Sequence, residues 1–134
     1  MHTSQVEQEN LATVRRGYEA FNAGDMGTLA AVFRDDVEWY GSDLGALRGT
    51  RRGKGDLFTL FGELQQETNG TFRSIGTAYA AAGDQVFVRA ITTGVRNGKQ
   101  LDTEDVLVFG LSGGLVTRVD VFPHDQKTYD AFFA

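Results

Sequence analysis

The stretch Leu101-Asp-Thr-Glu-Asp105-Val-Leu-Val-Phe109 decides how the second half of this chain folds. Successive side chains of a β-strand point to opposite faces of the sheet. If Leu101, Leu107 and Phe109 face a core, then Asp105 must face that core as well. A carboxyl group on an apolar sheet face is costly to ionise, so we expect the pKa of Asp105 to be raised. Such a group can donate or carry a proton near neutral pH.

Alternating segments continue on both sides of this stretch. Besides the strand that holds Asp105, strands are predicted over residues 71–81, 86–96 and 115–122. Asn97-Gly98 is a strong signal for a two-residue hairpin turn. Pro123 ends the last strand because proline cannot donate a hydrogen bond to a ladder. These segments predict an antiparallel sheet connected by hairpins.

The first half of the chain has helical spacing instead. Ser4 and Glu7 have the spacing of a capping box, and Gly24 is suited to end the first helix. Asp25 is predicted to begin a second helix that carries Phe33 inward, and Asp56 a third helix. A short strand over 37–40 and a glycine-rich loop over 41–53 lie between the last two helices.

Helices followed by strands are typical of the α+β class. We therefore predict a single domain over residues 1–134, in which a cone-shaped, curved antiparallel sheet packs on three helices. Asp125 can begin a further turn or two of helix after the sheet. The space between the sheet and the helices is the default place for a hydrophobic pocket.

The composition argues against several classes of function and of binding site. With no cysteine there is no disulfide or thiolate chemistry, and a net charge of −5 argues against nucleic-acid binding. No apolar run approaches the roughly 20 residues that span a membrane, and no signal peptide is evident, so we expect a cytoplasmic protein. His2 and His124 form no credible metal site, and no phosphate-binding glycine motif occurs, so we expect no metal and no cofactor.

Four short motifs of the sequence point to a known protein family. They are Tyr18-Glu-Ala-Phe-Asn-Ala-Gly-Asp25, Leu29-Ala-Ala-Val-Phe-Arg-Asp-Asp36-Val-Glu-Trp39, Arg48-Gly-Thr-Arg-Arg-Gly53 and Asp105-Val-Leu-Val-Phe109. Together they resemble the nuclear-transport-factor-2-like superfamily, in its SnoaL-like and ketosteroid-isomerase-like branch, over nearly the whole chain. The resemblance implies the cystatin-like cone-shaped fold. Members of the superfamily include isomerases, polyketide cyclases, epoxide hydrolases and proteins with a pocket but no known reaction, so the site must be argued from its residues.

Ketosteroid isomerases use a tyrosine on the first helix, an aspartate base after the first strand, and a protonated aspartate in the sheet. Asp105 matches the sheet aspartate. The tyrosine position falls on Gly17, with Tyr18 one residue along, and the base position falls on Gly41, with Asp43 two residues on. A true ketosteroid isomerase is therefore disfavoured unless Asp43 moves into the place of the base.

Polyketide cyclases and epoxide hydrolases of this superfamily use catalytic residues at other positions of the sequence. SnoaL-type cyclases are similar to this chain in using a sheet acid and an apolar cavity without metal or organic cofactor, and their acid lies near Asp120. Alternation with Val119 and Val121 predicts that Asp120 faces outward. An epoxide hydrolase would need an arginine such as Arg89, which the same reasoning faces outward, and His124 is expected to serve as part of a helix start.

We therefore predict cofactor-independent acid/base chemistry, of isomerase, cyclase or hydrolase type, on a small hydrophobic molecule that contains a carbonyl group. Asp105 would donate or carry the proton, and Tyr18 would supply a hydrogen bond. The substrate-binding walls would be Val14, Trp39, Phe61, Val88, Phe109 and Val121. Two alternatives stay open: Asp105 as a structural residue paired with a hydroxyl or an arginine, and a non-catalytic ligand-binding or dimerisation module. In either case we expect a homodimer through the outer face of the sheet.

Overall fold

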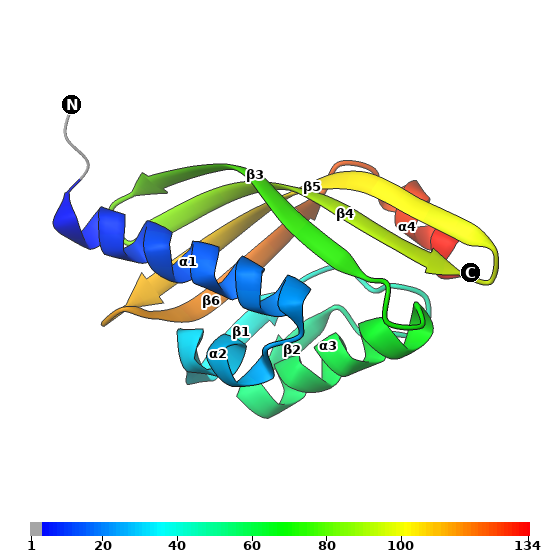
Figure 1. Cartoon of the computed structure of the whole chain (residues 1–134), viewed down its shortest axis with the longest axis horizontal. Coiled ribbons are helices and arrows are strands. Elements are labelled where there is room, and N and C mark those ends of the chain that lie inside the picture. Colours follow the sequence, from blue (N-terminus) through cyan, green and yellow to red (C-terminus); the bar gives the residue numbers. More distant parts are fainter. Residues whose placement is uncertain (1–3) are drawn as a thin grey trace.

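The computed structural model describes residues 4–134, so His2 lies outside the described residues. The helices are α1 (Gln5–Ala23), α2 (Met26–Val32), α3 (Lys54–Glu67) and α4 (Gln126–Phe132). The strands are β1 (Phe33–Tyr40), β2 (Thr50–Arg52), β3 (Arg73–Ala82), β4 (Gln85–Arg96), β5 (Lys99–Ser112) and β6 (Leu115–Pro123). Figure 1 shows a curved sheet with α1 lying across it, α2 and α3 on the same side, and α4 beside one end. The predicted α+β architecture is confirmed.

The six strands form one sheet in the order β2-β1-β6-β5-β4-β3. The four long strands follow one another as hairpins, as predicted, and Asn97 (φ 50°) and Gly98 (φ 77°) both adopt the positive φ of the expected turn. β1 joins this unit by pairing parallel with β6, which sets Trp39 beside Val119. The sheet is therefore mixed and not purely antiparallel.

The ends of α1 follow the capping signals in the sequence. The Ser4 Oγ accepts the Glu7 backbone N–H at 3.1 Å, and the Glu7 carboxylate accepts the Ser4 N–H at 2.9 Å. The helix ends at Gly24, whose φ of 72° is easily adopted only without a side chain. Asp25 then caps α2 by accepting the Thr28 N–H at 3.2 Å.

Three local predictions were wrong in detail. Phe33 lies in β1 and not on the second helix, because α2 ends at Val32 and the chain becomes extended. The loop predicted over 41–53 contains the short strand β2. Asp56 lies in the first turn of α3, whose cap is Gly53, and binds the Arg52 N–H at 3.2 Å.

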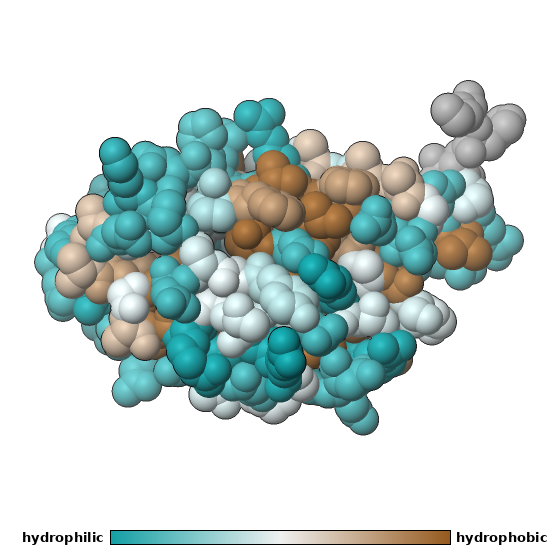
Figure 2. All heavy atoms as spheres, turned by 180° about the vertical axis from the view of Figure 1, so that it is seen from behind, coloured by the Kyte–Doolittle hydropathy of each residue, from teal (hydrophilic) through white to brown (hydrophobic). Residues whose placement is uncertain are grey.

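The outer face of the sheet carries exposed apolar side chains on four strands. They are Ile75, Phe87, Val95, Val106 and Phe122. Figure 2, the view from behind Figure 1, shows apolar side chains gathered over the middle of the molecule. Arg89 lies on this face, as predicted, and pairs across the strands with Glu104, with Nε 2.9 Å from Oε2. Within residues 4–134 no helix is both long and apolar enough to span a membrane.

Candidate active site

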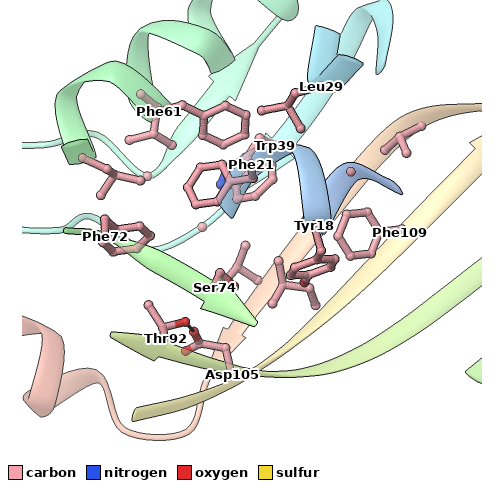
Figure 3. Close-up of a pocket in the computed structure, with 18 of the residues that line it drawn as sticks. Tyr18, Phe21, Leu29, Trp39, Phe61, Phe72, Ser74, Thr92, Asp105 and Phe109 are labelled. Atoms are coloured by element: carbon pink, nitrogen blue, oxygen red, sulfur yellow. Dashed lines mark hydrogen bonds between the residues drawn. The ribbon is translucent and has the colours of Figure 1, made fainter. Parts of the chain in front are cut away.

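A cavity of about 120 Å³ lies between the helices and the inner face of the sheet. Its walls are largely apolar and aromatic, and Figure 3 shows Phe21, Leu29, Trp39, Phe61, Phe72 and Phe109 around it. The rings pack edge to face, with centroids 5.6 Å apart for Trp39 and Phe61. Six oxygen-bearing side chains interrupt this lining: Tyr18, Ser42, Ser74, Thr92, Asp105 and Tyr129.

The structure brings most of the predicted site residues together. The predicted residues that line the cavity are Val14, Tyr18, Trp39, Phe61, Asp105, Phe109 and Val121. Val88 does not line it, although it is buried and faces inward as predicted. Alternation along β4 fixes the face on which Val88 lies, but not its position along the curved sheet, and α1 packs over this part of β3 and β4.

Asp105 faces the interior from β5, as its alternation with Leu107 and Phe109 predicted, and is only 4% exposed. The Thr92 hydroxyl and the Tyr129 hydroxyl each donate a hydrogen bond to its Oδ2 at 2.6 Å. Its Oδ1 is buried and has no hydrogen-bond partner among residues 4–134. Burial raises the pKa of Asp105, and the two hydroxyl hydrogen bonds oppose that rise without cancelling it.

Tyr18 reaches the cavity from α1, with its ring edge-on to Phe109 at 5.8 Å between centroids. Its hydroxyl is buried and makes no hydrogen bond within the described part of the chain. Burial raises the pKa of Tyr18 far above its usual range, and the nearby Tyr79 hydroxyl and Asp105 carboxyl group add to the rise, while the Ser74 side chain opposes it. Tyr18 therefore stays protonated and can donate a hydrogen bond to a ligand.

The sequence did not predict two residues of the site, Thr92 and Tyr129, which both bind Asp105. Tyr129 lies in the last helix, which was expected only as a turn or two after the sheet, and its hydroxyl binds Asp105 across 24 positions of sequence. Pro123 and the Asp125 cap signal where α4 begins, and Asp125 does accept the Lys127 N–H at 3.0 Å. No local pattern reveals which strand residue the helix meets, because that contact depends on how α4 packs against β5.

The positions of the ketosteroid-isomerase tyrosine and base are both glycine here, and both glycines line the cavity. Asp43 does not replace the base. It is exposed, lies outside the cavity lining, and accepts the Gly49 backbone N–H at 2.9 Å, which holds the loop after β1. Asp105 is therefore the only carboxylate among the described residues that line this cavity.

The remaining candidates lie on the outside, as alternation predicted for Asp120 and Arg89. Asp120 forms an ion pair with Arg118 at 2.9 Å and does not reach the cavity. Arg89 pairs with Glu104 on the outer face of the sheet. His124 is exposed at the end of β6. Across residues 4–134, no three His, Asp or Glu side chains are grouped closely enough to hold a metal ion.

Comparison with known proteins places this geometry in a family. The model of the SnoaL-like domain matches residues 14–119. The fold is similar to that of Bal32a, from a soil-derived mobile gene cassette, with 32% identity and a TM-score of 0.93 over 97% of this chain and 100% of that one. It is also similar to a protein of unknown function with a cystatin-like fold from Xanthomonas campestris, with 28% identity and a TM-score of 0.86 over 93% and 98% of the two chains. An uncharacterized protein of Mycobacterium tuberculosis is 28% identical over 96% of this chain and 98% of its own length. The predicted resemblance is confirmed, and the chain belongs to the SnoaL-like domain family, within the nuclear-transport-factor-2-like superfamily.

Proposed function

We propose that this SnoaL-like protein carries out cofactor-independent acid/base chemistry on a small, uncharged carbonyl compound, with Asp105 carrying the proton. The observation that supports this function is a buried carboxyl group with one oxygen unpartnered in an apolar cavity. Burial raises the pKa of Asp105 toward the range in which a group can both accept and return a proton near neutral pH.

The geometry suits a reaction that one carboxyl group can complete alone. The Asp105 carboxylate would take a proton from the carbon next to the carbonyl group, breaking the C–H bond and leaving its electron pair in an enolate. Tyr18 would donate a hydrogen bond to the enolate oxygen, where the negative charge develops. The protonated Asp105 would then return the proton to a carbon atom, so that no electron is gained or lost.

The size and polarity of the cavity limit the substrate. An apolar cavity of roughly 150 Å³ holds one benzene ring, so the cavity of about 120 Å³ is suited to a molecule with a single small ring. No lysine or arginine lies among the described residues that line it, so a carboxylate or phosphate group would lose its hydration without gaining a counter-charge. A small cyclic ketone or enone meets both limits.

Deuterium exchange tests this chemistry without knowledge of the natural substrate. Cyclohexanone and 2-cyclohexenone in D₂O would be incubated with the protein, and the loss of C–H signal beside the carbonyl group followed by proton NMR. We expect the wild type to accelerate exchange and Asp105→Asn to lose roughly 100-fold or more of that activity. Asp102→Asn, which removes a carboxylate from the outer face of the same strand, is the matched control and should exchange like the wild type. Equal exchange by Asp105→Asn and the wild type would contradict the proposal.

A second candidate, a non-catalytic module that binds the same class of ligand, is favoured by one observation. Glycine lies at both positions where ketosteroid isomerases carry a tyrosine and a base, so the cavity lacks a second acidic group. A thermal-shift screen of steroids, polyketide-like aromatics and terpenoid epoxides distinguishes the two functions when it is run alongside the exchange assay. Ligands that raise the melting temperature while no compound is turned over would favour the binding module.

A further inference from the structure

Two hydroxyl groups converge on the same oxygen of Asp105. Thr92 reaches it from β4 and Tyr129 from α4, each with a donor–acceptor distance of 2.6 Å to Oδ2 (Figure 3 shows Thr92 against Asp105). Thr92 is 2% exposed and Tyr129 is 5% exposed. The two hydroxyls are also close to each other, since a hydrogen bond from the Thr92 side chain acts to lower the pKa of Tyr129. The other oxygen, Oδ1, is equally buried and receives no hydrogen bond from this part of the chain.

This asymmetry decides which oxygen carries the proton. If the proton lay on Oδ2, it would meet two hydroxyl groups that already donate to that atom, and one of them would have to turn its hydrogen away. A buried hydroxyl hydrogen without an acceptor costs about 1–3 kcal/mol. A proton on Oδ1 disturbs neither bond. Its own hydrogen has no acceptor among residues 4–134, but Asp105 lines the cavity, where a bound ligand can accept it. In the ionised form the two donors stabilise Oδ2, so Oδ1 is the oxygen left to accept a proton.

Both donors to Asp105 keep their hydroxyl hydrogen. Thr92 does not ionise, and the surroundings of Tyr129 keep it protonated. Tyr129 from α4 and Tyr18 from α1 face Asp105 from the helices, and burial and the Asp105 charge raise the pKa of each tyrosine far above its usual range. Arg89, Glu104 and His124 line a second surface depression, to which Asp105 itself also contributes. Arg89 and Glu104 are already paired with each other at 2.9 Å.

We infer that Thr92 and Tyr129 are positioning residues that direct the exchangeable proton of Asp105 to Oδ1, the oxygen without a partner among residues 4–134. This inference rests on the proposed function in one respect, namely that turnover uses this proton. Removal of either donor leaves the proton free to occupy either oxygen. It also removes a hydrogen bond that favours the carboxylate, so Asp105 becomes a weaker acid.

The test is a carbon-13 NMR titration of the Asp105 carboxyl carbon in the wild type, Tyr129→Phe and Thr92→Val. We expect each substitution to raise the pKa of Asp105 by about one unit, the equivalent of one hydrogen bond of modest strength. Thr92→Ser keeps a hydroxyl and should titrate like the wild type, which separates the hydrogen bond from packing. Tyr18→Phe removes a cavity hydroxyl that does not bind Asp105 and should leave the titration close to that of the wild type.

The titration tests the positioning role separately from the proposed acid/base chemistry, because it needs no substrate. Unchanged titrations in both Tyr129→Phe and Thr92→Val would overturn the positioning role, even if Asp105→Asn abolishes exchange. Raised pKa values together with an active Asp105→Asn variant would support the positioning role and refute the proposed chemistry. If Tyr129→Phe loosens α4, the Thr92→Val and Thr92→Ser pair still decides the question, since both substitutions lie in the interior of β4.

Discussion

The substitution Asp105→Asn should make the protein more stable, relative to the wild type, as the pH rises above the ordinary pKa of an aspartate. Asparagine has the shape of aspartate, and its side-chain oxygen can accept the same hydrogen bonds from Thr92 and Tyr129. It differs in having no charge to bury. The wild-type carboxyl group is only 4% exposed, and its burial raises the pKa of Asp105 above the ordinary value.

The sign and size follow from proton linkage. An aspartate in the unfolded chain titrates near pH ~3.9, and below that pH both states are protonated and the wild type has its full stability. Between the unfolded and the folded pKa the native state binds more protons than the unfolded state. The free energy of unfolding then falls by up to about 1.4 kcal/mol per pH unit, and it levels off above the folded pKa. The Asn variant cannot titrate at this position and loses nothing from this source.

Urea unfolding from pH 4 to pH 8 measures this difference, and Trp39, the only tryptophan, is a convenient fluorescent probe because it lines the cavity. The variant's advantage should grow with pH and then become constant, and the pH at which it does so gives the folded pKa of Asp105. Asp102→Asn is the control for loss of a negative charge, since its side chain is exposed on the same strand. A difference that stays flat from pH 4 to 8, or one that favours the wild type as the pH rises, would refute the argument from burial.

Three further substitutions test a loop beside the cavity, the cap of α1 and the outer face of the sheet. Gly49→Ala should lower the free energy of unfolding by about 1–3 kcal/mol in the same assay, because a Cβ atom there would lie 2.1 Å from the Ser42 carbonyl oxygen and the loop would have to shift. Ser4→Ala should lower it by about 1 kcal/mol through loss of the α1 cap, and an unchanged unfolding midpoint would show that the cap contributes nothing. Val106→Arg should convert a homodimer into a monomer in light scattering, because the outer sheet face combines exposed apolar side chains with charges of both signs and can pack against a copy of itself. A wild type that is already a monomer would contradict the dimer.

The features that could be predicted from the sequence are those set by neighbouring residues. Alternation within one strand suffices to face Asp105 inward and Arg89 outward, because a strand has only two faces. The Asn97-Gly98 hairpin and the Ser4 and Gly24 helix ends depend on backbone preferences of the residues themselves. Each of these was placed correctly for that reason.

The features that could not be predicted depend on distant parts of the chain. Phe33 has the apolar character of an inward helical residue, but pairing of β1 with β6 draws it into an extended strand beside Val116. The Tyr129 hydroxyl meets Asp105 only because of where α4 docks. Val88 shares its face with the cavity residues but lies where α1 covers the sheet. Sequence periodicity predicts which way a side chain points, but it does not predict which distant residues that side chain contacts.

The parallel pairing of β1 with β6 has a consequence for the order in which this protein folds. The strands from β3 to β6 are joined by short turns, whereas β1 must reach β6 across most of the chain, pairing Phe33 with Val116. Loop closure over that distance is entropically expensive, so the hairpins can form before β1 docks. Trp39 of β1 and Asp105 line the same cavity, so we expect water to reach the Asp105 carboxyl group more easily before β1 docks. Above the ordinary aspartate pKa, the penalty for dehydrating this carboxylate therefore falls on the last docking step. Amide hydrogen exchange in β1 should then accelerate with pH beyond its chemical rate, while the hairpin strands remain protected.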